Sequence, residues 1–210
     1  MAVWVSESVI SPSARAHDLA HVEQFFERLG LRRVVKSMPP LALWATYVFA
    51  NGFLSMALLA MLAVGTGVPF VFPSLGPTAY QLFFLPRAES STPRNTLLGH
   101  FIGLVCGYAA FRIAAIPVSV AVATRTFDWR PVLASALSLS STAALMILLN
   151  ASHPPAGATT LIVSLGIITR PQYLAVIEIA VFLLIAQAFC VHRLARLPYP
   201  IWKDPPRGPE

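Results

Sequence analysis

The sequence predicts an all-α membrane protein with four full transmembrane helices and two shorter, interrupted segments. Of its 210 residues, 56% are hydrophobic and 11% are charged, and its mean hydropathy is +0.68. Soluble domains carry about 25% charged residues. The charges gather in residues 1–36, in short loops and after residue 192. The apolar stretches between them approach the roughly 20 residues that cross a bilayer, so lipid is the expected surrounding.

The basic balance and the two cysteines exclude several other classes of protein. A net charge of +6 is expected where Lys and Arg flank membrane spans. The sequence lacks the basic stripe with interleaved aromatic residues that would indicate a nucleic-acid partner. Cys106 and Cys190 both lie in apolar runs and form neither a disulfide framework nor a metal-binding spacing. The common catalytic and nucleotide-binding motifs are also missing. We therefore expect no enzyme, no cofactor and no metal.

Residues 1–37 are expected to form a cytoplasmic segment that contains one amphipathic helix. Within residues 18–35, apolar side chains recur at helical spacing on one face, namely Leu19, Val22, Phe25, Phe26 and Leu29. Such a helix either lies on the membrane interface or docks on the loops of the protein itself. Charges interrupt this segment throughout, so no signal peptide is expected.

Residues 38–197 are expected to form the transmembrane domain, in halves of about 41–119 and 131–192, followed by an irregular polar tail, 198–210. The full spans are predicted at 41–64, 96–119, 131–149 and 172–192. Arginine and lysine flank both ends of the domain, which predicts that both termini are cytoplasmic and that the number of crossings is even. If the interrupted segments re-enter, the chain crosses four times. If they traverse the bilayer, it crosses six times.

The two interrupted segments share a short motif at matching positions in the two halves. "PSLGPT" at 73–78 and "PPAGAT" at 154–159 both read P-x-x-G-x-T, 81 residues apart. Each copy follows one full span and precedes another, which indicates an internal repeat. The halves would be parallel with four crossings and inverted with six.

Paired interruptions of this kind point to a transporter binding site. Non-helical backbone survives in lipid only where it is buried or faces a watery cavity. The short helix that follows each break begins with free N–H groups and a positive dipole end, which attract an anion. The breaks themselves are attributed to the structural residues Pro73, Pro77, Pro154 and Pro155. The expected anion-binding residues are Ser74, Gly76, Thr78, Arg94, Asn95, His100, His153, Gly157, Thr159 and Thr160.

Within this set, the histidines are expected to tune charge or carry a proton, because imidazole titrates near neutral pH. Arg94 and Asn95 either attract the anion at one mouth or hold the first broken segment. Gly99, Gly103 and Gly107 form a small-residue stripe for close helix packing, and this stripe could also serve a homo-oligomer. Arg112 and Glu178 lie within predicted spans. Each is either functional or structural, with Arg112 reaching toward a loop and Glu178 pairing with Arg170.

The stretch "SHPPAGATTLIVSLG" resembles the signature of the HPP family of integral membrane proteins. The family's first-half features also resemble "PSLGPTAYQLFF", the run Pro93-Arg94-Asn95 and the pair Gly99-His100, so the resemblance covers roughly residues 40–192. Pro73 and Pro77 depart from the small residues usual in the family, and Thr78 stands where Ser is common. The resemblance implies a membrane protein with about four spans. Because some photosynthetic members are implicated in nitrite transport, it also implies a nitrite or small-anion transporter.

The leading hypothesis is therefore a transporter or channel for a small inorganic anion, nitrite first, in the inner membrane of a bacterium. Two alternatives stay open. One is a non-transporting membrane scaffold or sensor whose N-terminal helix binds a partner. The other is a membrane-embedded enzyme that acts on a lipid or quinone.

Overall fold

The computed structural model describes residues 12–114 and 129–203, which are helical almost throughout. In chain order, the described helices are α1 (Pro12–Arg28), α2 (Arg32–Ser37), α3 (Pro40–Thr66), α4 (Leu75–Phe84), the 3₁₀ helix η1 (Glu89–Ser91), α5 (Pro93–Ile113), α6 (Trp129–Leu148), α7 (Ala156–Ser164) and α8 (Pro171–Ala195). The last residues of the predicted second span, 115–119, and the tail residues 204–210 lie outside the described residues. The described part of the tail, 198–203, forms no helix.

Within the described ranges, four helices are long and apolar enough to cross a membrane: α3, α5, α6 and α8. This confirms the predicted fold class. The helices α4 and α7 have only 10 and 9 residues, and at 1.5 Å per residue each covers about half of a hydrocarbon core roughly 30 Å thick. They are preceded by the non-helical stretches 67–74 and 149–155. The interrupted segments are thus half-length helices with non-helical lead-ins.

Local sequence sets where these helices begin and end. Proline occupies the first turn of α3, α5 and α8, where its missing N–H costs nothing. Thr92 caps α5 by accepting a hydrogen bond from the backbone N–H of Asn95. Gly67 and Asn150 adopt left-handed backbone (φ 67° and 47°) and end α3 and α6.

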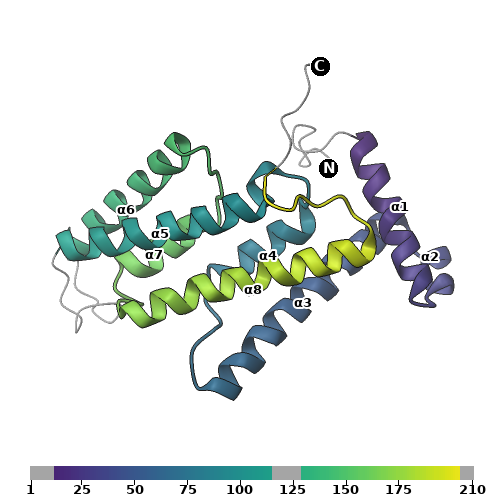
Figure 1. Cartoon of the computed structure of the whole chain (residues 1–210), viewed down its shortest axis with the longest axis horizontal. Helices are drawn as coiled ribbons and strands as arrows, with labels where there is room; N and C mark the ends of the chain where they lie inside the picture. Colours follow the sequence, from purple (N-terminus) through teal and green to yellow (C-terminus); the bar gives the residue numbers. More distant parts are fainter. Residues whose placement is uncertain (1–11, 115–128, 204–210) are drawn as a thin grey trace.

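Contacts between helices fix their directions in the first half (Figure 1). Tyr47, early in α3, lies beside Phe83 at the end of α4 and bonds His192 near the end of α8, so α4 and α8 run opposite to α3. The end of α4 meets the start of α5, and Thr78 in the first turns of α4 bonds His100 in α5. Helix α5 therefore runs opposite to α4 and in the same direction as α3.

In the second half, each helix runs opposite to its counterpart in the first half. One apolar cluster joins the start of α6 to the end of α5, and a second joins the end of α6 to the middle of α5, so these helices are antiparallel. The first cluster consists of Ala110, Phe111, Ala114 and Ala134, and the second of Ile102, Cys106, Met146, Ala151 and Ala156. Helix α7 runs parallel to α5 along the glycine stripe, and α8 returns to the starting end. Each broken segment thus joins opposite ends of the bundle, as in the six-crossing topology.

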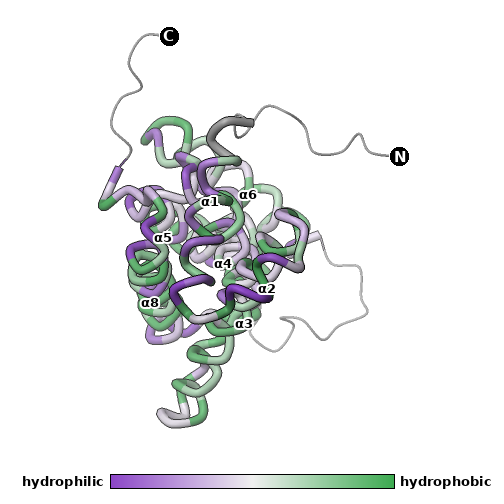
Figure 2. Tube along the Cα trace, turned by 90° about the vertical axis from the view of Figure 1, so that its right-hand side faces the viewer, coloured by the Kyte–Doolittle hydropathy of each residue, from purple (hydrophilic) through white to green (hydrophobic). Residues whose placement is uncertain are grey.

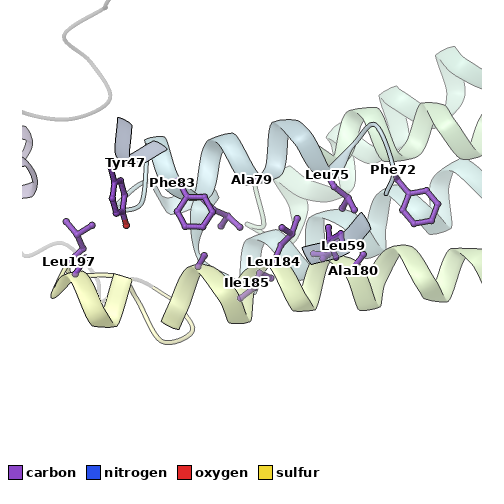
Figure 3. Packing of buried hydrophobic residues seen from close by; sticks show 14 of the residues in the cluster. Tyr47, Leu59, Phe72, Leu75, Ala79, Phe83, Ala180, Leu184, Ile185 and Leu197 are labelled. Carbon is purple, nitrogen blue, oxygen red and sulfur yellow. The ribbon is translucent and has the colours of Figure 1, made fainter. Parts of the chain in front are cut away.

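The main apolar core lies between α3, α4 and α8 (Figure 3). Leu59, Leu75 and Ala180 meet there, and Tyr47 and Phe83 extend the core toward α1. From the lead-in to α4, Phe72 is buried and joins this core, whereas Gly67, Pro69, Val71 and Pro73 are exposed.

Helix α1 docks on the bundle at the end where α3 begins and α8 ends. Val22 and Phe26 are buried in the main core, and the Asp18 carboxylate pairs with Arg87 in the connection after α4 at 2.5 Å. Of the two placements open to the amphipathic helix, the structure shows docking on the protein itself, on helices α3 and α8 as well as on a loop. Viewed from this end, α1 and α2 are rich in polar residues and α3 projects as a largely apolar rod (Figure 2).

Candidate functional site

The two copies of the P-x-x-G-x-T motif fold into the same turn. The backbone N–H of Leu75 bonds the carbonyl of Phe72 at 3.0 Å, and the N–H of Ala156 bonds the carbonyl of His153 at 3.1 Å. These bonds lie 81 residues apart, like the motifs. The matching geometry places Thr78 and Thr159 at equivalent positions in the first turns of α4 and α7. Common ancestry of the halves stays an interpretation.

The two equivalent threonines bind opposite sides of one histidine ring. His100 is fully buried about 10 Å along the axis of α5 from its start. Its Nε2 lies 2.8 Å from Thr78 Oγ1 and its Nδ1 lies 2.7 Å from Thr159 Oγ1. Thr78 Oγ1 also lies 3.0 Å from the carbonyl of Ser74, which can only accept, so the hydroxyl donates there. A neutral ring that donates from Nε2 and accepts at Nδ1 satisfies every partner.

His153 lies against His100, with ring centroids 5.0 Å apart, and is also fully buried. Its Nδ1 lies 2.7 Å from the carbonyl of Ser90, so Nδ1–H is the donor. The other nitrogen, Nε2, is buried and has no hydrogen-bond partner among the described residues. The hydroxyl of Ser74, the residue before α4, is likewise buried without a partner. Unpaired buried polar atoms are costly, so this region is a candidate binding site.

The backbone at the start of α7 differs from the expectation of free N–H groups. The N–H groups of Ala156, Gly157 and Ala158 bond back to the carbonyls of residues 153–155 at 3.0 to 3.1 Å. The two preceding residues, Pro154 and Pro155, have no N–H. The prediction that bare amides of α7 meet a solute is therefore wrong in this conformation, because a tight first turn uses them. The dipole end and the side chains are what α7 presents.

Arg94 and Asn95 lie at the start of α5 and hold neighbouring backbone. The Arg94 guanidinium donates to the carbonyls of Asn150 and Leu149 at 2.7 and 3.0 Å, and so caps the end of α6. It also donates to Asn95 Oδ1 at 2.9 Å. The Asn95 amide donates to the carbonyl of Glu89 at 3.0 Å. Both side chains thus fix the loops around the buried cluster without entering it.

The remaining predicted residues lie around the cluster at varying distance. Thr160 accepts a hydrogen bond from Thr142 of α6 at 3.1 Å. A side chain added at Gly157 would meet Leu139 of α6, and one added at Gly76 would meet nothing within 4 Å. Neither glycine therefore packs against the histidines. Pro73, Pro77 and Pro154 are exposed, and Pro155 is buried.

The glycine stripe seats α7 within the chain. An ideal Cβ at Gly99 would lie 2.6 Å from His153 Cβ, one at Gly103 would lie 2.8 Å from the carbonyl oxygen of Ala156, and one at Gly107 would lie 2.7 Å from that of Thr160. Real Cβ contacts are not this short, so only glycine fits. The stripe is occupied and is not free to pack against a second copy. That the protein forms a homo-oligomer stays a prediction, and the contact would have to use another face.

The two ionisable residues in the predicted spans differ in their surroundings. Arg112 lies in the last turn of α5 and is exposed. Glu178 has one buried carboxylate oxygen without a partner, and no ion pair between Glu178 and Arg170 is found among the described residues. The expected pairing of Glu178 with Arg170 is therefore not formed.

Three contributors to the site were missed by sequence reasoning. Ser90 supplies the carbonyl that binds His153, Thr96 lies 3.5 Å from the same nitrogen, and Thr142 binds Thr160. Thr96 precedes His100 by four residues, and this helical spacing could have identified it. Among the described residues, no three His, Cys, Asp or Glu side chains are placed to hold a metal ion.

These features define an integral membrane protein of four long helices in which two half-length helices meet at a buried histidine–threonine cluster. The chain belongs to the HPP family, since the model of the HPP transmembrane region matches residues 37–200. The resemblance inferred from the sequence is thereby confirmed. A transmembrane protein of Dictyostelium discoideum is 30% identical over 128 residues, which make up 60% of this chain and 41% of that relative. The chain thus spans less than half the length of that relative. No solved structure matches the chain significantly.

Proposed function

We propose that this chain is a transporter or channel for a small inorganic anion, with nitrite as the first candidate. The observation that carries the proposal is the meeting of α4 and α7 at His100. The two helices run in opposite directions, and the first turn of each contributes a threonine to the same ring. Both N-terminal ends therefore face one buried place. Each end carries about half a positive elementary charge, and two such ends favour a negative charge between them.

The donors available there are mostly side chains, because the first-turn amides of α7 are already bonded. The Ser74 hydroxyl is buried without a partner and can donate to an anion. His153 Nε2 bears no proton when Nδ1–H donates to Ser90 and the ring is neutral, so it accepts a proton instead. This combination suits a weak acid that arrives as an anion together with a proton. Nitrite is such a species.

The distribution of basic residues supports a cytoplasmic location for the end where α3 begins and α8 ends. This end of the described chain holds Arg28, Arg32, Arg33, Lys36, Arg87, Arg94, Arg193, Arg196 and Lys203, and the opposite end holds Arg112, Arg130 and Arg170. Cytoplasmic flanks carry the excess of Lys and Arg. In a bacterium, this orientation corresponds to the inner membrane.

The test is nitrite uptake by the purified full chain in liposomes. We expect uptake above that of empty vesicles, faster when the external pH is lowered, and reduced about tenfold or more by His153→Ala. His17→Ala serves as the matched control, since His17 is an exposed histidine on α1. Uptake no greater than in empty vesicles, for nitrite and for other small anions, would refute the proposal.

A second set of variants separates transport from a scaffold role. A scaffold or sensor that acts through its N-terminal helix loses function when residues 1–36 are deleted, and it tolerates substitution at Ser74, Thr78 or Thr159. The structure lends this alternative little support. The most buried apolar side chains of α1, Val22 and Phe26, already pack on the bundle.

A further inference from the structure

A pocket of about 480 Å³ lies at the end of α8, apart from the histidine–threonine cluster. Apolar and aromatic side chains line it together with two arginines, Arg193 and Arg196. The other lining residues are Phe189, Leu197, Pro198, Tyr199 and Ile201. Its walls come from the last turns of α8 and from the tail that follows. The pocket therefore combines an apolar surface with two permanent positive charges.

Arg196 has an unusual backbone conformation for an arginine. It ends α8 in the left-handed region, at φ 55°, with its N–H bonded to the carbonyl of Arg193 at 3.2 Å. The next N–H, of Leu197, bonds the carbonyl of His192 at 2.9 Å. This is the helix-ending turn in which glycine is strongly preferred, because other residues are strained there. An arginine at such a position suggests that its side chain has a role.

Neither arginine is neutralised by a carboxylate in the described chain. The ion pair that this part of the chain forms lies elsewhere, between Arg87 and Asp18. Both arginines are exposed. Two guanidinium groups beside one pocket are well suited to bind the oxygens of a phosphate.

If α8 spans the bilayer, its end places the pocket at the membrane interface. It begins where the long apolar helix α8 ends, and Ile201 and Trp202 beside it are exposed. Tryptophan and tyrosine favour the headgroup level of a bilayer. The tail is held in place by two hydrogen bonds, from Tyr199 Oη to the carbonyl of Ser91 at 2.8 Å and from the N–H of Arg94 to the carbonyl of Trp202 at 3.1 Å.

We propose that this pocket binds the headgroup of an anionic phospholipid. Arg193 and Arg196 bind the phosphate, while Phe189 and Ile201 contact the adjoining acyl chains. The apolar walls and the position beside α8 favour a lipid over free phosphate, because free phosphate has no apolar part to contact such walls. Because the tail also bonds the loop before α5, a bound headgroup would hold this loop and the end of α8 together. The proposal does not depend on the function of the His100 cluster.

Native mass spectrometry of the full chain in detergent, with added phosphatidylglycerol or phosphatidylcholine, tests the site. Both lipids offer a phosphate to the arginines, but the choline cation of phosphatidylcholine repels the two guanidinium groups. We therefore expect phosphatidylglycerol to bind about tenfold more tightly. Arg196→Gly should abolish most of this preference without lowering the melting temperature, because glycine accepts the backbone conformation. Arg170→Gln, which removes a charge at the opposite end of α8, is the control and should leave binding unchanged.

Three outcomes would overturn the proposal. The two lipids could bind equally, or Arg196→Gly could retain the full preference. Alternatively, millimolar inorganic phosphate could displace the bound phosphatidylglycerol in the same measurement, which would identify a free-phosphate site. Nitrite uptake is measured separately, so failure here and failure of the proposed transport function are distinguishable.

Discussion

Replacement of Gly107 by alanine tests whether α5 and α7 are in closest possible contact. The new Cβ would lie 2.7 Å from the carbonyl oxygen of Thr160 and 2.9 Å from Cβ of Val163, whereas ordinary contact begins near 3.4 Å. Backbone cannot swing aside like the end of a side chain, so α7 must move by several tenths of an ångström. Overpacking of this kind costs about 1–3 kcal/mol. The better helix propensity of alanine returns roughly 1 kcal/mol.

Gly52→Ala is the matched control, because it makes the same chemical change inside another long helix, α3. A Cβ there meets nothing within 4 Å. The substitution should therefore stabilise the protein by up to about 1 kcal/mol through propensity alone. The two variants should differ by roughly 1–3 kcal/mol in opposite directions, provided the overpacking cost at Gly107 exceeds its propensity gain.

The assay is unfolding of the purified chain in mixed detergent micelles, by heat or by titration with sodium dodecyl sulfate, followed by circular dichroism. A domain of 150–250 residues shifts its Tm by roughly 2–4 °C per kcal/mol, so the difference is measurable. If Gly107→Ala melted at or above the temperature of Gly52→Ala, the inferred contact between α5 and α7 would be refuted.

Three further predictions concern contacts that hold the bundle. Tyr47→Phe leaves Nδ1 of buried His192 without its donor, 3.0 Å away, and should cost about 1–3 kcal/mol in the same unfolding assay. Arg94→Gln removes two bonds to the end of α6 and should cost about 1.5–3 kcal/mol, with faster hydrogen exchange there. Burial raises the pKa of Asp18 more than the Arg87 guanidinium lowers it, so its stabilising contribution is full below the ordinary value of 3.8 and is lost as the pH rises through the raised pKa. Protection of α1 amides, corrected for intrinsic exchange, should fall over that range in the wild type and stay level in Asp18→Asn.

The sequence was sufficient to predict the four long helices and the two breaks, because these follow from local properties. A run of apolar residues must be helical in lipid, and Pro-x-x-Gly interrupts it wherever it falls. The number of traversals was not predictable. Charge bias constrains only which flanks share a side, and both four and six crossings satisfied it. Helix direction is set by long-range contacts such as Tyr47 with His192.

The candidate site was predictable in its composition but not in its geometry. The motif identified Thr78 and Thr159, and nothing in their spacing indicated that both would bind His100, 22 and 59 residues away along the chain. The stripe at Gly99 was read as packing, and the identity of its neighbour, His153, required the fold. The state of the α7 amides depends on whether the first turn is tight, which proline content alone does not decide.

The opposed arrangement of α4 and α7 explains why one histidine can serve both halves of the chain. If the helices ran in the same direction, one would present its negative end to the other's positive end, and the two fields would largely cancel. Because they run in opposite directions, their positive ends add at His100, where an added cation is disfavoured and an anion is favoured. A neutral ring that donates on one side and accepts on the other fits between them without adding a positive charge. The ring therefore closes the gap between the half-helices in this conformation, and a solute that reached it would have to displace a threonine from one nitrogen or the other.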